Sequence, residues 1–285
     1  MSVRLDLLDS LSIPGDAAKP NEDSFTAESF LAAVFDGATG LGERLMPGRS
    51  DAQWIAQFGA RRLRAHAQSG DGGLRDWLRA AAADAEKSFK ALRRRAPLEN
   101  YEIAYASAMM IAPRGDALDL LWFGDCAALL RESSGALTML GDTLDRREAE
   151  RARVARLVKP GRGPAAAGVR DEFLPALRAS RNHVNTAGGD WLFAPDESCA
   201  DHAKEARIAV RAGSLVLLAS DGFLALISDY QRYTPEALLA AAEQRGLAPL
   251  GEELRAIEAA DPDGLRHPRF KRSDDATAIL LAVRS

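Results

Sequence analysis

Two apolar segments of this chain stop at the same dipeptide, Asp-Gly, and no other feature limits the possible folds as strongly. The first, residues 29–36, ends at Asp36-Gly37, and the second, residues 214–219, ends at Ser220-Asp221-Gly222. Short apolar runs bounded by turn residues are typical of buried β-strands. A strand that runs into an acidic residue places that carboxylate at the edge of its sheet. We therefore predict two buried strands with acidic ends.

Further strands are predicted along the whole chain. Residues 3–13 and 206–210 have strand composition, and residues 276–283 form a final apolar run directly after Asp274-Asp275. Between residues 102 and 140 the pattern predicts a meander, in which short connections favour antiparallel pairing of consecutive strands. The strands of this meander are residues 103–112, 118–123 and 127–131, with turns at 113–116 and 133–135.

Helices are predicted between these groups of strands. Ser50 precedes Gln53 by three residues, which is the pattern of a capping box at the start of a helix of about five turns. A second, alanine-rich helix is predicted over residues 74–95, and we expect it to pair with the first in antiparallel fashion. Thr234 and Pro235 have the residue types of an N-cap and a first helical position, so another helix is expected to begin there.

The alternation of strand groups with helix groups predicts one α+β domain over residues 1–285, with helices outside the sheets. The sequence has no internal repeat and no composition shift that would mark a domain boundary. Residues 142–201 begin with a helical pattern and become rich in Gly, Pro and Ala around residues 159–168. We expect this long excursion to form a flap over a site rather than a linker.

The composition excludes several classes of function. The chain has 285 residues, 47% of them hydrophobic, and a formal net charge of −4, so it can form a large core and has no basic excess for nucleic acid. Its apolar runs are far shorter than the ~20 residues that span a bilayer. Asp6 and Asp9 interrupt the N-terminal run, which argues against a secretory signal, and two cysteines are too few for a disulfide framework. We expect a cytoplasmic protein without membrane or nucleic-acid partners.

Acidic residues gather at the predicted strand ends and turns without histidine or cysteine beside most of them. They are Glu22, Asp23, Asp36, Asp125, Asp221, Asp274 and Asp275. An all-oxygen cluster of carboxylates suits Mg²⁺ or Mn²⁺ better than zinc or copper. Two such ions ~3.5–4 Å apart can bridge a water molecule, lower its pKa and clamp a phosphoryl group. Each Asp-Gly taken alone is also a common turn signal.

Five segments that carry these acidic residues resemble, in order, the signature motifs of the type 2C metal-dependent Ser/Thr protein phosphatases. They are Asn21-Glu22-Asp23, Ala33-Val34-Phe35-Asp36-Gly37, Phe123-Gly124-Asp125, Leu217-Leu218-Ala219-Ser220-Asp221-Gly222-Phe223 and Ser273-Asp274-Asp275-Ala276-Thr277. The resemblance implies a four-layer α-β-β-α sandwich with two central antiparallel sheets. It also implies hydrolysis of phosphoserine and phosphothreonine on proteins by a water that bridges two metal ions.

The same resemblance assigns roles to the acidic residues. Asp36 would bridge two Mg²⁺ or Mn²⁺ ions, and Asp36 and Asp221 would be the catalytic residues. Asp125 matches a Gly-Asp-Ser motif, here Gly124-Asp125-Cys126, and ranks below the others because that position is more often structural. The implied metal ligands are Glu22, Asp36, the carbonyl of Gly37, Asp221 and Asp274, with Asp23 and Asp275 supporting them from behind.

The chain departs from the family at positions that grip the substrate. The family's phosphate-binding arginine, four residues before the first glutamate, is Ala18 here, and the adjacent Lys19 is the nearest candidate for a phosphate contact. Lysine lacks the bidentate fork with which arginine grips a phosphate. The histidine that follows the first Asp-Gly in eukaryotic members is Ala38. The chain therefore retains fewer of the family's substrate-binding residues than of its metal-binding residues.

A third metal position is incomplete in this sequence. Its aspartate, three or four residues beyond the second Asp-Gly, is replaced by Leu224 and Ala225. Glu102 aligns with its other ligand. We expect two metal ions and an incomplete third position.

Other functions that use glycine-rich loops or aspartates fit these residues less well. The glycine-rich segment 37–42 lacks the spacing of a dinucleotide fingerprint, and no Gly-Lys-Ser/Thr follows it. A phosphatase with an aspartyl nucleophile would need Asp-x-Asp, and Ala38 stands at the second position. The alternative that stays open is a catalytically weak, phosphatase-like regulatory or binding protein. Clustered carboxylates repel one another without metal, which favours a metal-dependent enzyme with a phosphoprotein substrate, expected as a monomer.

Overall fold

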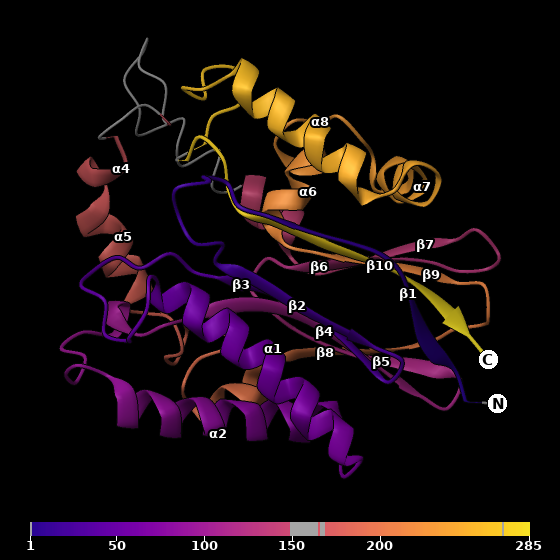
Figure 1. Cartoon of the computed structure of the whole chain (residues 1–285), viewed down its shortest axis with the longest axis horizontal. Coiled ribbons are helices and arrows are strands. Elements are labelled where there is room, and N and C mark those ends of the chain that lie inside the picture. Colours follow the sequence, from indigo (N-terminus) through magenta and orange to yellow (C-terminus); the bar gives the residue numbers. More distant parts are fainter. Residues whose placement is uncertain (1, 149–164, 166–168, 270) are drawn as a thin grey trace.

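The computed structural model describes residues 2–148, 165, 169–269 and 271–285, and these form two five-stranded antiparallel sheets that lie face to face (Figure 1). The first sheet has the order β1 (Arg4–Ile13), β10 (Ala276–Arg284), β9 (Leu215–Ala219), β6 (Ala127–Arg131) and β7 (Leu137–Leu140). The second has the order β2 (Asp23–Glu28), β3 (Leu31–Gly37), β4 (Ala106–Arg114), β5 (Ala117–Phe123) and β8 (Lys204–Ala209).

Helices cover the outer face of each sheet. The helices over the second sheet are α1 (Asp51–Ser69) and α2 (Leu74–Leu92), and those over the first are α6 (Asp221–Ser228), α7 (Pro235–Arg245) and α8 (Leu247–Ala260) (Figure 1). The shorter helices are η1 (Asn100–Glu102), α4 (Val169–Glu172), α5 (Leu174–Arg181) and η2 (Glu197–His202). This confirms the predicted α-β-β-α sandwich. None of the described helices is long and apolar enough to cross a membrane.

Strand β3 shows why an uninterrupted apolar run marks the centre of such a fold. Val34 packs between the two sheets with Ile279 of β10, whereas its neighbour Phe35 packs on the opposite face, under α1. Both faces of the strand are therefore buried, and both demand apolar side chains. Only at Asp36, one residue before the end of β3, does a charged side chain become possible.

The helix pair over the second sheet follows the sequence prediction closely. The Ser50 hydroxyl accepts a hydrogen bond from Gln53 N at 3.2 Å and caps α1. The Gln53 side chain does not complete a capping box: it donates to the Asn21 carbonyl at 3.1 Å and so ties the helix to the segment before β2. Helix α2 ends at Leu92, three residues before the predicted end.

Strand β2 was missed, and one predicted pairing of strands was wrong. Strand β2 was not predicted, because its six residues include few apolar side chains and its burial comes from pairing with β3. The predicted meander is broken between β5 and β6, which pair with strands of different sheets. Gly124, at φ 64°, starts the turn that carries the chain from one sheet to the other. A short connection fixes the distance between two strands but not their pairing.

The predicted excursion over residues 142–201 is described in part. Residues 143–148 are helical, as expected, while residues 149–164 and 166–168, which include most of its Gly-, Pro- and Ala-rich part, lie outside the described residues. The end of α5 is attached to η1, because the Asn100 side chain donates to the carbonyls of Asn182 at 3.2 Å and Val184 at 2.6 Å. The two short helices therefore lie side by side at one end of the sandwich (Figure 1).

Helix α1 packs tightly against two aromatic rings at Gly59. A Cβ atom there would meet ring atoms of Phe193 at 2.7 Å and Phe35 at 2.9 Å. We expect Gly59→Ala to lower the free energy of unfolding by about 1–3 kcal/mol, because the overpacked contact outweighs the better helix propensity of alanine. Urea unfolding followed by circular dichroism measures the change. Gln57→Ala, on the exposed face of the same helix, is the control, and equal stability of the two variants would contradict this close packing.

Candidate metal centre

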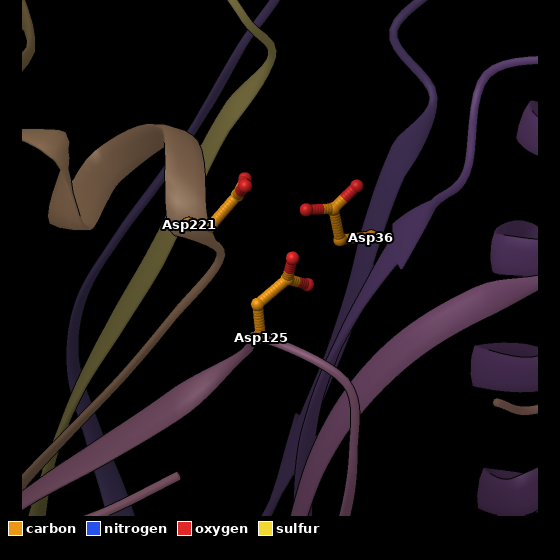
Figure 2. A group of neighbouring side chains, drawn as sticks. All are labelled: Asp36, Asp125 and Asp221. Carbon is orange, nitrogen blue, oxygen red and sulfur yellow. The ribbon is translucent and has the colours of Figure 1, made fainter. Parts of the chain in front are cut away.

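Three aspartates converge where strands of both sheets end. Asp36 lies near the end of β3, Asp125 in the turn after β5, and Asp221 at the start of α6, just after β9. One carboxylate oxygen of each lies within 4.8 Å of the others, and Figure 2 shows the three side chains pointing toward one another. They line a cavity of about 300 Å³. The two Asp-Gly strand ends therefore meet at one cavity.

The glycine after each aspartate is required by close backbone contacts. A Cβ at Gly37 would lie 2.6 Å from the Glu22 carbonyl oxygen and would also collide with the Ala52 carbonyl. A Cβ at Gly222 would collide with the Asp275 carbonyl oxygen. The Asp-Gly pairs are thus more than turn signals, since each glycine lets another strand end pack beside its aspartate.

Asp23 lies behind the three aspartates and connects the two sheets. It stands opposite Asp36 in the pairing of β2 with β3. Its carboxylate accepts a hydrogen bond from the Ser220 hydroxyl at 2.8 Å, and that hydroxyl in turn accepts from Thr277 N at 3.0 Å. Burial of the group, followed by the charge of Asp275, raises its pKa well above the usual range. The supporting role expected for Asp23 stays a prediction.

Asp275 uses both carboxylate oxygens on the protein backbone. It accepts hydrogen bonds from Gly15 N at 2.8 Å and from Glu22 N at 2.6 Å. The Glu22 side chain is held in turn by the Thr39 hydroxyl at 2.6 Å and by the Ser50 hydroxyl that caps α1. Asp275 therefore positions Glu22 from 253 residues away in the sequence.

Asp274 lies beside the group of three and is paired with a cation. The Lys271 Nζ donates to its Oδ1 at 2.7 Å, and the Arg255 guanidinium donates to its backbone carbonyl at 2.8 Å. Burial alone would raise the pKa of Asp274, but Lys271 and then Arg147 lower it below the usual range. Asp274 is thus ionised and partly neutralised within the protein.

Solved structures identify the fold. The catalytic domain of the serine/threonine protein phosphatase PstP, in complex with two manganese ions, matches 99% of this chain and 100% of its own, with a TM-score of 0.58 and 19% identity. The Mycobacterium tuberculosis phosphatase PstP/Ppp matches with a TM-score of 0.59, 20% identity and 99% of each chain. The PPM Ser-Thr phosphatase MsPP from Mycobacterium smegmatis, in complex with cacodylate, matches 97% of this chain and 98% of its own, with a TM-score of 0.53 and 16% identity.

This chain has the PPM phosphatase fold. No protein-family model matches its sequence, and no curated protein matches it at a significant level. The likeness therefore lies in the arrangement of strands and helices rather than in overall sequence identity. The fold expected from the five acidic motifs is confirmed.

Within this PPM fold, the group of three aspartates concentrates negative charge. Burial, followed by the charges of Asp23, Asp221 and Asp125, raises the pKa of Asp36 well above the usual range. Burial is also the main cause that raises the pKa of Asp221 to about 7, with Asp125 and Asp274 adding to it and Arg147 opposing it. A bound divalent cation would lower these pKa values again, because it favours the ionised form of every carboxylate around it.

The residue types and distances fit a hard metal ion. The three facing side chains offer only oxygen, and their oxygens are close enough together to share one cation. Asp125, which the sequence ranked below the other acidic residues, belongs to this group. Its Oδ1 also accepts from the Ser107 hydroxyl at 2.6 Å, which fixes its orientation.

Arg147 belongs to the site, and the sequence prediction missed it. Its guanidinium lies 2.8 Å from Asp221 Oδ2 and 3.7 Å from Asp229 Oδ2, and only 12% of its side chain is exposed. It stands in helical residues 143–148, at the start of the long excursion. No local motif marks this arginine, so only the three-dimensional contact reveals it.

Two residues of lower rank in the sequence prediction lie outside the group of three. Lys19 is 76% exposed, and its Nζ lies 3.9 Å from Asp16 Oδ2. Glu102 accepts two hydrogen bonds from Arg95, at 2.8 and 2.9 Å, and one from Leu98 N. These contacts, led by Arg95, lower the pKa of Glu102 to about 2. Their predicted roles, a phosphate contact and a third-metal ligand, stay predictions.

The raised pKa of Asp221 predicts how the metal-free protein responds to pH. A group with a folded-state pKa near 7 and an unfolded value near 3.8 stabilises the fold below pH 4, and this contribution is lost as the pH rises through 7. In EDTA we expect stability to fall by about 2 kcal/mol from Asp221 alone between pH 5.5 and 8. Thermal unfolding at both pH values, with and without Asp221→Asn, measures this.

The asparagine variant should lose much of the pH dependence and be more stable than the natural chain at pH 8. Asp201→Asn, which changes an exposed carboxylate, should keep the natural slope. If Asp221→Asn and Asp201→Asn showed the same slope, the assignment of the high pKa to Asp221 would be wrong.

Proposed function

We propose that this chain is a metal-dependent protein phosphatase that hydrolyses phosphoserine and phosphothreonine. The observation that carries the proposal is the group of Asp36, Asp125 and Asp221, whose carboxylates face one another in a cavity at the strand ends. The PPM fold supports it, since PstP with this fold was solved with two manganese ions.

Two Mg²⁺ or Mn²⁺ ions held there would supply an activated water and neutralise the charge of a phosphoryl group. Asp36 and Asp221 are the proposed catalytic residues, because they bring one carboxylate from each sheet to the same point. The proposed ligand set is completed by Asp125, Glu22, the carbonyl of Gly37 and Asp274. Asp23 and Asp275 hold these groups in place through the hydrogen bonds described above.

The protein's own side chains favour attack by water over a covalent intermediate. Cys126 is fully buried, and burial followed by the charge of Asp36 raises the pKa of its thiol well above the usual range, so it is a poor nucleophile. The Ser107 hydroxyl, which lines the cavity, donates to Asp125. Arg147 and Lys271 also line the cavity and offer positive charge to a phosphate dianion, whereas the position of the family arginine is Ala18.

The second candidate function is a catalytically weak, phosphatase-like regulatory or binding protein. The alanines at positions 18 and 38 favour it. The crowding of acidic groups around Asp36 disfavours it, since it raises the cost of ionising them and a bound cation would offset that cost. We further propose a single domain over residues 1–285, a phosphoprotein as partner, a cytoplasmic location and a monomeric state. The net charge of −4 is consistent with a partner other than nucleic acid.

Hydrolysis of p-nitrophenyl phosphate and of a phosphothreonine peptide tests the proposal. We expect turnover with Mn²⁺, none with EDTA, and a loss of roughly 100-fold or more in kcat/KM for Asp36→Asn. Asp116→Asn, in the exposed turn between β4 and β5, should keep natural activity. Equal rates in Mn²⁺, in EDTA and in the Asp36→Asn variant would refute the proposed metal-dependent phosphatase activity. A preserved fold that binds no Mn²⁺ by calorimetry would instead support the regulatory candidate.

A further inference from the structure

Lys271 brings a positive charge onto the candidate metal centre from the loop before β10. Its Nζ donates to Asp274 Oδ1 at 2.7 Å and to Thr39 Oγ1 at 3.2 Å. Its side chain is 36% exposed, and it lines both the cavity of the three aspartates and the wider groove beside that cavity. The ammonium group thus lies at the boundary between the two spaces and touches a proposed metal ligand.

Thr39 extends this contact to the other side of the centre. Its hydroxyl donates to Glu22 Oε2 at 2.6 Å, while the Ser50 hydroxyl donates to the other Glu22 oxygen. A chain of polar contacts therefore runs from Asp274, next to the first sheet, through Lys271 and Thr39 to Glu22, next to the second. Both proposed ligands at the ends of this chain are already engaged by the protein.

The three aspartates, in contrast, are surrounded mainly by other acidic groups. Asp36 faces Asp23, Asp125, Asp221 and Asp274, all of them acidic. Arg147 contacts one oxygen of Asp221, but its charge is shared with Asp229. A divalent cation entering this group meets three facing carboxyl groups, one of which Arg147 contacts, whereas a cation approaching Asp274 meets an ammonium hydrogen-bonded to the ligand oxygen itself. Two positive ions cannot share that oxygen closely without strong repulsion.

On the basis of the proposed function, we propose that Lys271 competes with a metal ion for Asp274, so that the centre fills in two steps. The first ion binds at Asp36, Asp125 and Asp221. The second step, which recruits Asp274, requires that the Lys271 ammonium leave this carboxylate. Lys271 is thus a positioning residue that sets the metal concentration at which the centre is complete.

Titration of EDTA-stripped protein with Mn²⁺ tests this order of binding. Calorimetry gives the two dissociation constants, and electron paramagnetic resonance separates the six-line signal of isolated Mn²⁺ from the spectrum of a coupled pair. In the natural chain we expect isolated Mn²⁺ at one equivalent and a second step at least tenfold weaker. Lys271→Met, which keeps the length and removes the charge, should tighten the second step about tenfold and leave the first within threefold.

Two further variants control for charge in general. Lys271→Arg keeps a cation in place and should retain the weak second step. Arg272→Met removes one positive charge from the same loop through an exposed side chain, and it should change neither constant more than threefold. Thermal unfolding of each variant in EDTA verifies that it folds.

Two equal constants in the natural chain would overturn the proposal. So would a Lys271→Met protein whose second step is unchanged, or one whose second step is weaker, because Lys271 would then support Asp274 as a ligand instead of blocking it. The titration does not depend on turnover. A protein that binds Mn²⁺ in two steps but hydrolyses no phosphate ester would contradict the proposed function and leave the role of Lys271 standing.

Discussion

The structure depends on holding carboxylates together, against their mutual repulsion, where strand ends of the two sheets lie next to each other. Asp36, Asp125 and Asp221 bring their oxygens within 4.8 Å of one another, and burial removes much of the solvent that would screen them. They cannot move apart easily, because Gly37 and Gly222 press their strand ends against neighbouring carbonyl groups. A divalent cation turns this repulsion into attraction. The low stability expected of the ionised, metal-free centre and the metal affinity proposed for it therefore have one physical cause.

The other acidic residues make this crowding possible because their carboxylates accept hydrogen bonds from other groups of the protein. Asp23 accepts from Ser220, and Asp275 accepts from the backbone of Gly15 and Glu22. Each of these bonds connects segments that are far apart in the sequence, and the bonds of Asp23 with Ser220 and of Asp275 with Glu22 connect segments next to different sheets. The same contacts that satisfy these carboxylates thus hold the two sheets in register, so that the facing aspartates meet at one point.

Much of this arrangement could be predicted from the sequence, and the failures have physical reasons. Asp36 and Asp221 were identified because a strand buried on both faces admits a charge only where it ends. Asp125 was ranked lower because the family position that it matches is more often structural, and the sequence does not show that its turn joins strands of different sheets. Strand β2 was missed because partners in the sheet, not its own residues, make it a strand. Arg147 and Lys271 act through long-range contacts of charged side chains, which leave no periodic pattern.

The elements that supply positive charge differ from those that supply the carboxylates. Arg147 comes from the excursion after β7, and Lys271 from the loop between α8 and β10, while Asp36 and Asp221 are fixed by strands with little freedom to change. Side chains in connecting segments can be exchanged without disturbing the sheet register that aligns the aspartates. The alanine at position 18 therefore does not leave the centre without cations. It shifts the source of positive charge from the segment before β2 to two segments elsewhere in the fold, one of which also bonds to a proposed metal ligand.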